Sequence, residues 1–362
     1  MATHSVENRL WTILLPVVGT AAVALVTLGV VPYSHIAAAL PLALLLGACV
    51  FASVHHAEVI AARVGEPLGS IILALAVTVL EVGLILSLMS NLSNGGSTIA
   101  RDTVYSAIMI ITTGIVGLSL VLGSRLHFEQ TIRIRGTTSA LSVLVVLAVI
   151  TLILPNYTVS TPGPSFSSTQ LFLVALTSLV LYCTFLFVQT VRHREYFLPA
   201  DVEGADHAEP DTRTFWTSCV LLLAALFAVI MLSKSLSPVL TSMITSVGLP
   251  YSFTGVIIAT LVLLPEGIAA VRAALANRLQ VSINLALGSG LATIGLTIPT
   301  VALADILMGY NIALGISPGQ TTLLVLALFV SAITLGNGRT NILLGAAHLS
   351  IFAMFLLISA EG

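Results

Sequence analysis

Long apolar segments constrain the fold of this chain more than any other feature. They run about 17–25 residues, the length that crosses roughly 30 Å of hydrocarbon as a helix. The 362-residue chain is 57% hydrophobic and only 8% charged, whereas a soluble domain is about 25% charged. The alternating pattern of membrane β-barrel strands is missing from the sequence, so the spans should be helices. The sequence therefore predicts an all-α polytopic membrane protein.

Eleven spans can be counted, and the basic residues predict their orientation. Cytoplasmic loops of membrane proteins carry an excess of Lys and Arg. With the N-terminus in the cytoplasm, only Arg101 and Lys234 fall on the outside. The other basic residues fall on the inside: Arg9, Arg63, Arg125, Arg133, Arg135, Arg192, Arg194, Arg213, Arg272, Arg278 and Arg339. We therefore expect a multi-pass protein of the cell's inner (plasma) membrane with its C-terminus outside. The expected spans are 10–31, 35–62, 68–90, 101–124, 136–155, 168–191, 214–235, 252–275, 281–307, 319–336 and 341–359.

Two spans each carry a glutamate in an apolar run. GSIILALAVTVLEVG (69–83) contains Glu81 and aligns with TGVIIATLVLLPEGI (254–268), which contains Glu266. The following spans also correspond, with Gly117 matching Gly295. The first acidic span begins inside and the second outside, so the repeats are inverted. Inverted repeats with a polar site at the midplane are typical of secondary transporters.

Two carboxylates at membrane depth suggest a specific chemistry. A charge there costs at least about 2.5–3.5 kcal/mol, so each carboxyl should be protonated or paired with a cation. One divalent cation or two protons would neutralise both Glu81 and Glu266. Ca²⁺ takes about 6–8 oxygens, so hydroxyls and backbone carbonyls must contribute. Pro265 frees the carbonyl of Leu261, and the predicted supporting side chains are Thr78, Ser106, Thr112, Thr113, Asn284 and Ser289.

The segments 55–89 and 255–299 resemble the two alpha-repeats of the Ca²⁺:cation antiporter superfamily. Within it the chain is most similar to the cation/proton exchangers (CAX), in the bacterial calcium(sodium):proton antiporter branch called ChaA. The resemblance implies one leading helix, two inverted five-helix halves, and exchange of cytosolic Ca²⁺ for external H⁺. It also implies that Glu81 and Glu266 bind the ion, that Glu58 lies near the cytosolic mouth, and that Ser289 belongs to the Gly-Ser segment of the second repeat.

The sequence departs from the family pattern at three positions. The usual repeat reads Gly-Asn-Ala-x-Glu, but the Asn positions hold Thr78 and Leu263, and a common glutamine is Ala292. Fewer side-chain oxygens are then available for Ca²⁺, so exchange of Na⁺ or K⁺ for H⁺ is the alternative. An ion channel and an intramembrane protease using Ser289 are remote alternatives. We expect no enzyme activity and no cofactor.

The expected organisation follows the repeats. Residues 1–34 form a tail and leading helix, 35–191 the first repeat (alpha-repeat 55–123), 192–213 an acidic cytosolic linker, and 214–362 the second repeat (alpha-repeat 252–300). The net charge of −2 indicates no nucleic-acid partner, and the expected partners are the bilayer and the transported ions. Asp102, at the start of a span, is expected to stabilise a helix N-terminus. The sequence does not predict an oligomeric state.

Overall fold

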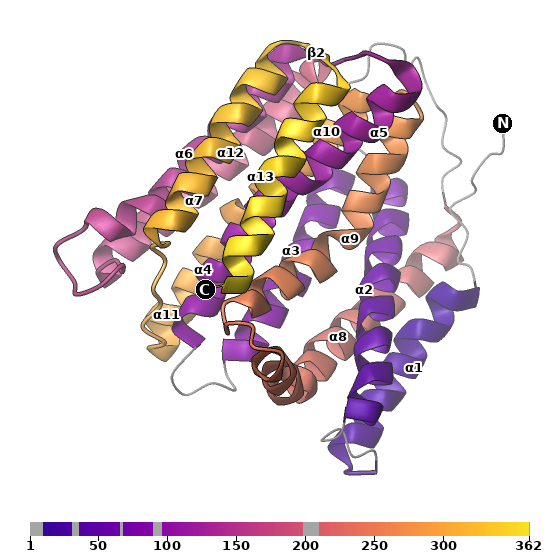
Figure 1. The fold of residues 1–362 in the computed structure, drawn as a ribbon. Coiled ribbons are helices and arrows are strands. Elements are labelled where there is room, and N and C mark those ends of the chain that lie inside the picture. Colours follow the sequence, from indigo (N-terminus) through magenta and orange to yellow (C-terminus); the bar gives the residue numbers. More distant parts are fainter. Residues whose placement is uncertain (1–9, 31–35, 66–67, 90–95, 198–209, 362) are drawn as a thin grey trace. The chain divides into compact units, whose positions relative to one another are not determined.

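A computed structural model describes residues 10–30, 36–65, 68–89, 96–197 and 210–361, and these are nearly all helical (Figure 1). Eleven helices in this part of the chain are long and apolar enough to cross a membrane, which confirms the predicted class. The unbroken helices are α1 (Leu10–Thr27), α2 (Ile36–Val64), α3 (Leu68–Met89), α8 (Thr212–Ser246), α9 (Phe253–Leu275), α12 (Pro318–Gly336) and α13 (Ile342–Glu361).

The remaining spans change helix type along their length. The fourth consists of α4 (Gly96–Met109), the π-helix η1 (Ile110–Ile115) and α5 (Val116–His127), and the ninth of α10 (Leu279–Ala292), the π-helix η6 (Thr293–Thr297) and α11 (Ile298–Met308). The fifth consists of α6 (Ile134–Ala148), η2 (Val149–Ile153) and η3 (Leu154–Tyr157), and the sixth of α7 (Ser168–Phe187) and η4 (Val188–Arg192). The 3-10 turn η5 (Arg194–Tyr196) and two short strands, β1 (Gln130–Thr131) and β2 (Arg339–Thr340), complete the described part.

Most predicted span ends lie within a few residues of the observed ones, but α8 is much longer than expected. The predicted span ends at 235, inside the stretch SKSLSP (233–238), yet the helix continues through Pro238 to Ser246. Hydroxyls in this stretch bond to the helix's own carbonyls, as Ser235 does to Met231 and Thr241 to Ser237. Polar side chains that satisfy themselves in this way are compatible with an apolar surrounding.

The chain forms two compact units that cut across the two sequence halves. One comprises Met1–Ser93 and Glu203–Val247, and the other comprises Asn94–Val202 and Gly248–Gly362. The predicted division into halves describes the repeat and remains a prediction. Residues 1–9 of the predicted tail and 198–209 of the predicted linker lie outside the described residues.

Close helix contacts and one buried histidine hold the first unit together. A Cβ added at Gly19 of α1 would lie 2.6 Å from Cys49 Sγ on α2, so these helices touch at a residue without a side chain. His56 is fully buried. Its Nε2 lies 2.9 Å from the carbonyl of Thr12, and its Nδ1 lies 3.2 Å from Ser218 Oγ. Because a carbonyl can only accept, Nε2 carries the proton, and the ring links α2 to α1 and α8.

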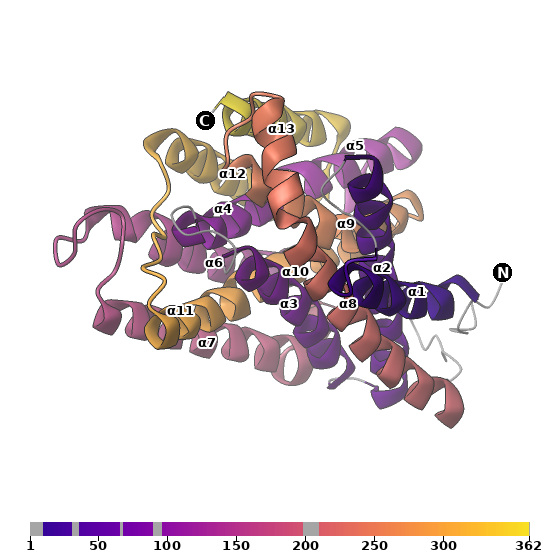
Figure 2. The ribbon, with the colours of Figure 1, turned by 90° about the horizontal axis from the view of Figure 1, so that it is seen from below.

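Reciprocal contacts in the second unit show the inverted repeat. Gly117 packs on His348 of α13, and its repeat partner Gly295 packs on Tyr182 of α7. An added Cβ would lie 3.0 Å and 2.6 Å, respectively, from the Cβ atoms of these partners. Helices α13 and α7 are the last spans of the second and first halves. Each half therefore lays its Gly-rich span against the final span of the other half. Figure 2 shows the second of these pairs, with α11 beside α7.

The connecting segments show the same exchange. Strand β1, after the fourth span, pairs antiparallel with β2, which precedes the last span. In the equivalent contact, the segment after the ninth span bonds to the segment before the sixth span. There Gly315 N donates to the carbonyl of Pro164 at 2.9 Å, and Asn156 Nδ2 donates to the carbonyl of Ile316 at 2.7 Å. A two-fold relation between the halves would produce this pattern.

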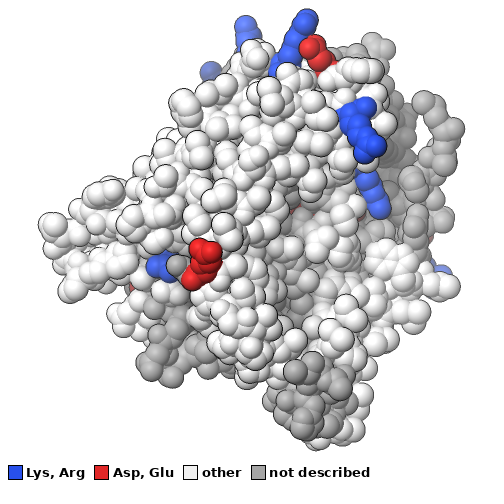
Figure 3. All heavy atoms as spheres, in the orientation of Figure 1, with Lys and Arg blue, Asp and Glu red and all other residues white. Residues whose placement is uncertain are grey.

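The surface is largely uncharged. In the view of Figure 3 the blue and red side chains are few, and white residues cover most of the described surface. Many large apolar side chains are exposed on the helices, among them Leu44, Phe172, Leu223 and Phe329. A surface of this kind suits contact with lipid chains rather than water.

Candidate ion-binding site

The first predicted ligand, Glu81, lies on α3 in the first unit. It is the only charged residue of that 22-residue helix and is 2% exposed. Helix α3 packs tightly on α8, because a Cβ added at Gly83 would lie 2.6 Å from Ile230 Cγ1. Ser87 Oγ also donates to the carbonyl of Ile230 at 3.3 Å. The backbone that carries Glu81 is therefore held against a long neighbouring helix.

Thr78 and Glu58 lie in the same unit and have different surroundings. Thr78, one turn before Glu81, is 6% exposed and donates its hydroxyl to the carbonyl of Ala74 at 2.8 Å. Its oxygen therefore keeps lone pairs that can face a cation. Glu58 is exposed on α2, while its neighbour His56 is buried in the hydrogen bonds described above. His56 is thus a buried structural imidazole, whereas Glu58, two residues farther along α2, is an exposed carboxyl.

The second predicted ligand, Glu266, lies half-buried on α9 in the second unit. Pro265 precedes it inside the helix. Proline has no N–H, so the carbonyl of Leu261 receives no helical hydrogen bond from that position. The second repeat therefore offers a backbone oxygen one turn before its carboxylate. In the first repeat, the hydroxyl of Thr78 likewise lies about one turn before the carboxylate of Glu81.

Helix α9 runs parallel to the fourth span, and this contact sets the level of Glu266. A Cβ added at Gly255 would lie 2.5 Å from the carbonyl carbon of Asp102. Farther along both helices, a Cβ added at Gly267 would lie 3.2 Å from Ile115 Cδ1. The stretch of α9 from Gly255 to Gly267 is nearly as long as the stretch of the fourth span from Asp102 to Ile115. Glu266, one residue before Gly267, therefore lies at the same height along the helix pair as Thr113 and the following residue of η1.

The predicted hydroxyl ligands of the fourth span are buried. Ser106, Thr112 and Thr113 are at most 2% exposed. The hydroxyls of Thr112 and Thr113 donate to the carbonyls of Ile108 and Met109, which leaves their oxygen lone pairs available. Two of the three predicted residues thus lie in the π-helical segment at the level of Glu266. Segments of π-helix occur frequently at functional sites.

A buried histidine that the sequence does not assign to the site binds this segment. His348 of α13 is fully buried, and its Nδ1 lies 2.7 Å from the carbonyl of Thr112. Its Nε2 lies 3.2 Å from Thr334 Oγ1. The carbonyl can only accept, so Nδ1 carries the proton and the neutral ring accepts from Thr334. A lone imidazole in an apolar span was the available sequence signal, but only the fold shows its partner.

The two predicted residues of α10 differ in how they are used. Asn284 is half-buried; its Nδ2 donates to the carbonyl of Phe197 at 2.5 Å, and its Oδ1 accepts from Gln280 Nε2 at 2.8 Å. Its amide is therefore engaged in joining α10 to the segment after α7. Ser289 is also half-buried, and its hydroxyl makes no hydrogen bond within the described residues. Of these two side chains, Ser289 remains the better candidate for contact with an ion.

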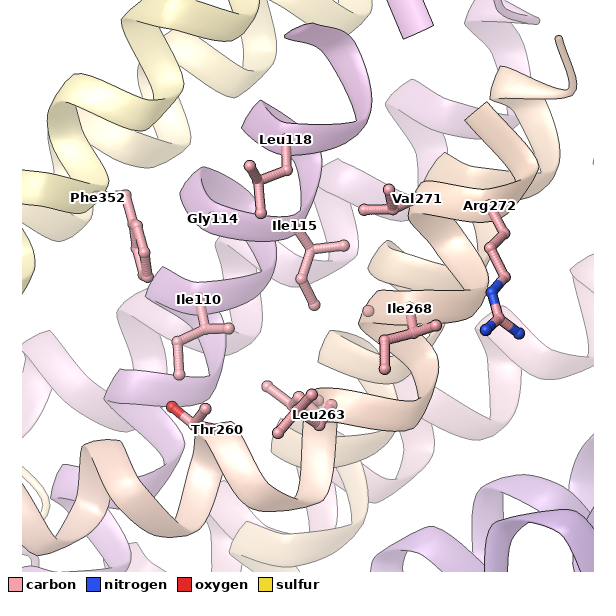
Figure 4. Close-up of a pocket in the computed structure, with 12 residues that line it drawn as sticks. Ile110, Gly114, Ile115, Leu118, Thr260, Leu263, Ile268, Val271, Arg272 and Phe352 are labelled. Carbon is pink, nitrogen blue, oxygen red and sulfur yellow. The ribbon is translucent and has the colours of Figure 1, made fainter. Parts of the chain in front are cut away.

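The large cavity beside α9 is apolar and is not the ion site. It has a volume of about 450 Å³, and Figure 4 shows Ile110, Ile115 and Leu118 of the fourth span facing Leu263 and Val271 of α9. The lining residues of α9 recur every three or four positions, and Glu266 is not among them. Its carboxylate therefore leaves α9 on another face. Leu263, at a position where the family pattern has Asn, contributes only carbon atoms to this cavity.

The described residues contain no group of three or more His, Cys, Asp and Glu side chains that could hold a metal ion. Glu81 belongs to the first compact unit and Glu266 to the second. Each unit carries one member of this glutamate pair on a membrane-length helix, together with hydroxyl or carbonyl oxygens. Such a donor set, all hard oxygens, suits Ca²⁺ or alkali cations rather than transition metals.

Eleven spans, reciprocal packing of two halves and one repeat-related glutamate in each half define a membrane cation exchanger. The chain belongs to the sodium/calcium exchanger protein family, whose model matches residues 34–191 and 217–360. A putative ionic transporter of Sinorhizobium fredii, y4hA, is 48% identical over 99% of this chain and 98% of that protein. The sodium-potassium/proton antiporter ChaA of Escherichia coli is 39% identical over 85% of this chain and 84% of its own length.

Solved structures show the same fold at low sequence identity. Native YfkE matches with a TM-score of 0.74 at 17% identity, covering 96% of this chain and 99% of that one. The H⁺/Ca²⁺ exchanger CAX matches with a TM-score of 0.72 at 18% identity, covering 96% and 88%, respectively. These findings confirm the predicted family and the eleven-span class.

Proposed function

We propose that the protein exchanges a cytosolic cation for external protons at a midplane site formed by Glu81 and Glu266. The observation that carries this proposal is the placement of one acidic residue on each of two repeat-related helices. Glu81 is nearly fully buried on α3, and Glu266 is level with the buried hydroxyl of Thr113. Membership of an exchanger family supports the same function.

Two carboxylates that share one ion site would couple ions to protons through their mutual repulsion. At an effective dielectric constant of about 20, two such charges about 6 Å apart repel by about 3 kcal/mol. One divalent cation or two protons removes this cost. The empty site is then the least stable state, so a change of access is favoured only when ions or protons fill it. This competition gives alternating access with exchange and requires no second binding site.

We propose Ca²⁺ as the principal cation, because one divalent ion balances both carboxylates. The hydroxyls of Thr78, Thr113 and Ser289 and the carbonyl of Leu261 would complete its oxygen ligands. Exchange of Na⁺ or K⁺ is the second candidate, and two observations favour it. The Leu263 side chain offers no oxygen where the family pattern has Asn, which removes one possible ligand from the 6–8 that Ca²⁺ takes. A relative at 39% identity is a sodium-potassium/proton antiporter.

Everted membrane vesicles with a pH-sensitive dye test this function. Ca²⁺, Na⁺ and K⁺ are added separately to a preformed proton gradient, and only a transported cation should collapse it. Glu81→Gln and Glu266→Gln should each lower the flux at least about tenfold, because each removes a charged ligand worth about 1.5–3 kcal/mol. Glu195→Gln is the matched control, since that carboxyl is 63% exposed.

Each outcome of this experiment has a defined meaning. Wild-type flux in both Glu81→Gln and Glu266→Gln would show that the proposed site is wrong. Collapse of the gradient by Na⁺ or K⁺ but not Ca²⁺ selects the second candidate. Cation flux that moves no protons would contradict antiport and indicate a channel. Loss of flux on Ser289→Ala alone, with peptide cleavage by the wild type, would indicate a protease.

A further inference from the structure

A buried carboxyl outside the two-glutamate site lies on the side that the charge pattern predicts to be external. Asp102, near the start of the fourth span, is 3% exposed. Its Oδ1 accepts a hydrogen bond from Arg101 Nε at 2.8 Å. The Thr98 hydroxyl also interacts with this carboxyl group, but Oδ2 is buried and has no hydrogen-bond partner of normal geometry among the residues that the structure describes. Asp102 is the seventh residue of α4, whose first turn holds no acidic residue, so the expectation that it stabilises the helix N-terminus is wrong.

Asp102 lines a polar cavity within the second unit. The cavity has a volume of about 210 Å³, room for roughly seven waters at about 30 Å³ each. Hydroxyl groups from four chain segments surround it, and one of them, Ser106, lies one turn beyond Asp102 on the same face of α4. Its polar lining residues are Asp102, Tyr105, Ser106, Ser252, Ser317, Gln320 and Ser359.

Arg101, the ion-pair partner of Asp102, lines a second, larger cavity. Arg101 lines a hollow of about 750 Å³ with Asn156, Tyr157 and Thr321, and Ser317 borders both cavities. The Arg101 side chain is 17% exposed, and its Nη1 donates to the carbonyl of Gly315 at 3.1 Å. The ion pair is thus a polar connection between an exposed hollow and the buried cavity.

The titratable and charged groups around Asp102 are few. Arg101 and Tyr105 lie on its own helix, and Tyr251 precedes α9; α12 and α13 contribute no titratable side chain to the described cavity lining. Burial and the Asp102 charge raise the pKa of the Tyr251 hydroxyl to about 12. Tyr251 therefore stays a neutral hydroxyl that can donate to an adjacent carboxylate or water.

We propose that Asp102 and its cavity form a proton-loading site, at which protons from the external solution enter the second unit before they reach Glu266. This inference rests on the proposed proton exchange. Asp102 packs against Gly255, and Glu266 lies eleven residues farther along α9, about 16 Å at 1.5 Å per residue. That distance excludes direct contact with the same ion. Asp102 acts earlier, by exchanging protons with water in the cavity.

The donor set favours a proton over a metal cation as the ligand. Ser317 and Gln320 bond to each other's backbone in the capping box of α12, so their side chains are already engaged. Asp102 Oδ2, Ser106, Ser252 and Ser359 then leave fewer oxygens than the 6–8 of a Ca²⁺ site. A cation at Oδ2 would also lie close to the Arg101 guanidinium. A proton needs only one oxygen, and it can reach that oxygen through water.

Proton-coupled cation flux in proteoliposomes, measured against external pH, tests the proposal. Asp102→Asn keeps the shape of the side chain but cannot take up a proton. We expect it to require about tenfold more external protons for half-maximal flux, equivalent to one pH unit. The maximal flux and the KM for the cation should stay near wild type. Asp305→Asn is the control, because that carboxyl lies on the same predicted side and accepts from Ile312 N at 3.1 Å; it should leave the pH profile unchanged.

A second measurement separates this proposal from the proposed function. Infrared difference spectra of the purified protein at mildly acidic and mildly alkaline pH report protonation of buried carboxyls without transport. The carboxyl band should lose one component in Asp102→Asn and none in Asp305→Asn. Asp102→Glu should restore the pH profile if Asp102→Asn folds poorly.

The results that would overturn proton loading differ from the result that would overturn the proposed function. A wild-type pH profile and an unchanged infrared band in a folded Asp102→Asn protein would overturn proton loading, even if Glu266→Gln abolishes exchange. A raised cation KM with an unchanged pH profile would show a metal-cation site and also overturn it. If the wild type exchanges no protons, the proposed function fails, and the infrared band alone then shows whether Asp102 takes up a proton.

Discussion

Replacing Gly255 with alanine should weaken the packing of α9 on the fourth span. The added Cβ would lie 2.5 Å from the carbonyl carbon of Asp102 and 2.8 Å from the backbone nitrogen of Thr103. Carbon atoms normally pack at about 3.5–4.0 Å, so relief requires a backbone shift of about 1 Å. Backbone atoms cannot move aside as a flexible side chain can. Overpacking of this kind costs about 1–3 kcal/mol.

The higher helix propensity of alanine would stabilise the Gly255→Ala variant. This gain has to be subtracted before the packing cost can be measured. Alanine in a helix interior is favoured over glycine by about 0.5–1 kcal/mol. Gly288, inside α10, has no atom of the described residues within 4 Å of an added Cβ. Gly288→Ala therefore gains propensity without a clash. The free energy of unfolding of Gly255→Ala should lie below that of Gly288→Ala by about 1–3 kcal/mol, the packing cost alone.

Equilibrium unfolding in mixed micelles of mild detergent and dodecyl sulfate measures this difference. The unfolding free energies of the wild type and both variants are compared at the same micelle composition. If Gly255→Ala is stabilised as much as Gly288→Ala, then α9 and the fourth span do not approach at this point. The level assigned to Glu266 beside Thr113 would then lose its basis.

Two further predictions concern groups near the same contact. His348→Leu should lower the free energy of unfolding by about 1–3 kcal/mol, because the buried carbonyl of Thr112 loses its donor. His348→Gln should recover part of this loss. Equal stability of the two variants would contradict the assigned hydrogen bond. Tyr251 has its pKa raised from 10.0 to about 12, so its contribution to stability is complete below pH 10 and is lost as the pH rises to about 12. Alkaline unfolding of Tyr251→Phe should lack this component, and an identical alkaline profile would show that Tyr251 titrates normally.

Much of the architecture was predictable because a membrane imposes strong one-dimensional constraints. Apolar length identifies the spans, and the high cost of a buried charge makes Glu81 and Glu266 conspicuous in the sequence. The long α8 was missed because its serines and threonines read as a loop, although they satisfy their hydroxyls on their own helix. The repeat was found by aligning the spans of Glu81 and Glu266, and the fold gives the reason for the matching glycines in the spans that follow. Gly117 and Gly295 permit close contact with His348 and Tyr182.

The amino-acid sequence alone identifies which segments leave water and which two repeat-related glutamates enter the membrane with them. How neighbouring polar groups are used depends on the folded arrangement of the helices. Asn284 appeared to be a ligand, but its amide binds Phe197 and Gln280. Asp102 appeared to be a helix-terminal charge, but it is buried at a polar cavity. The physical reason is that transfer from water depends on the composition of a segment, whereas hydrogen bonding depends on which distant segments the fold brings within about 3 Å.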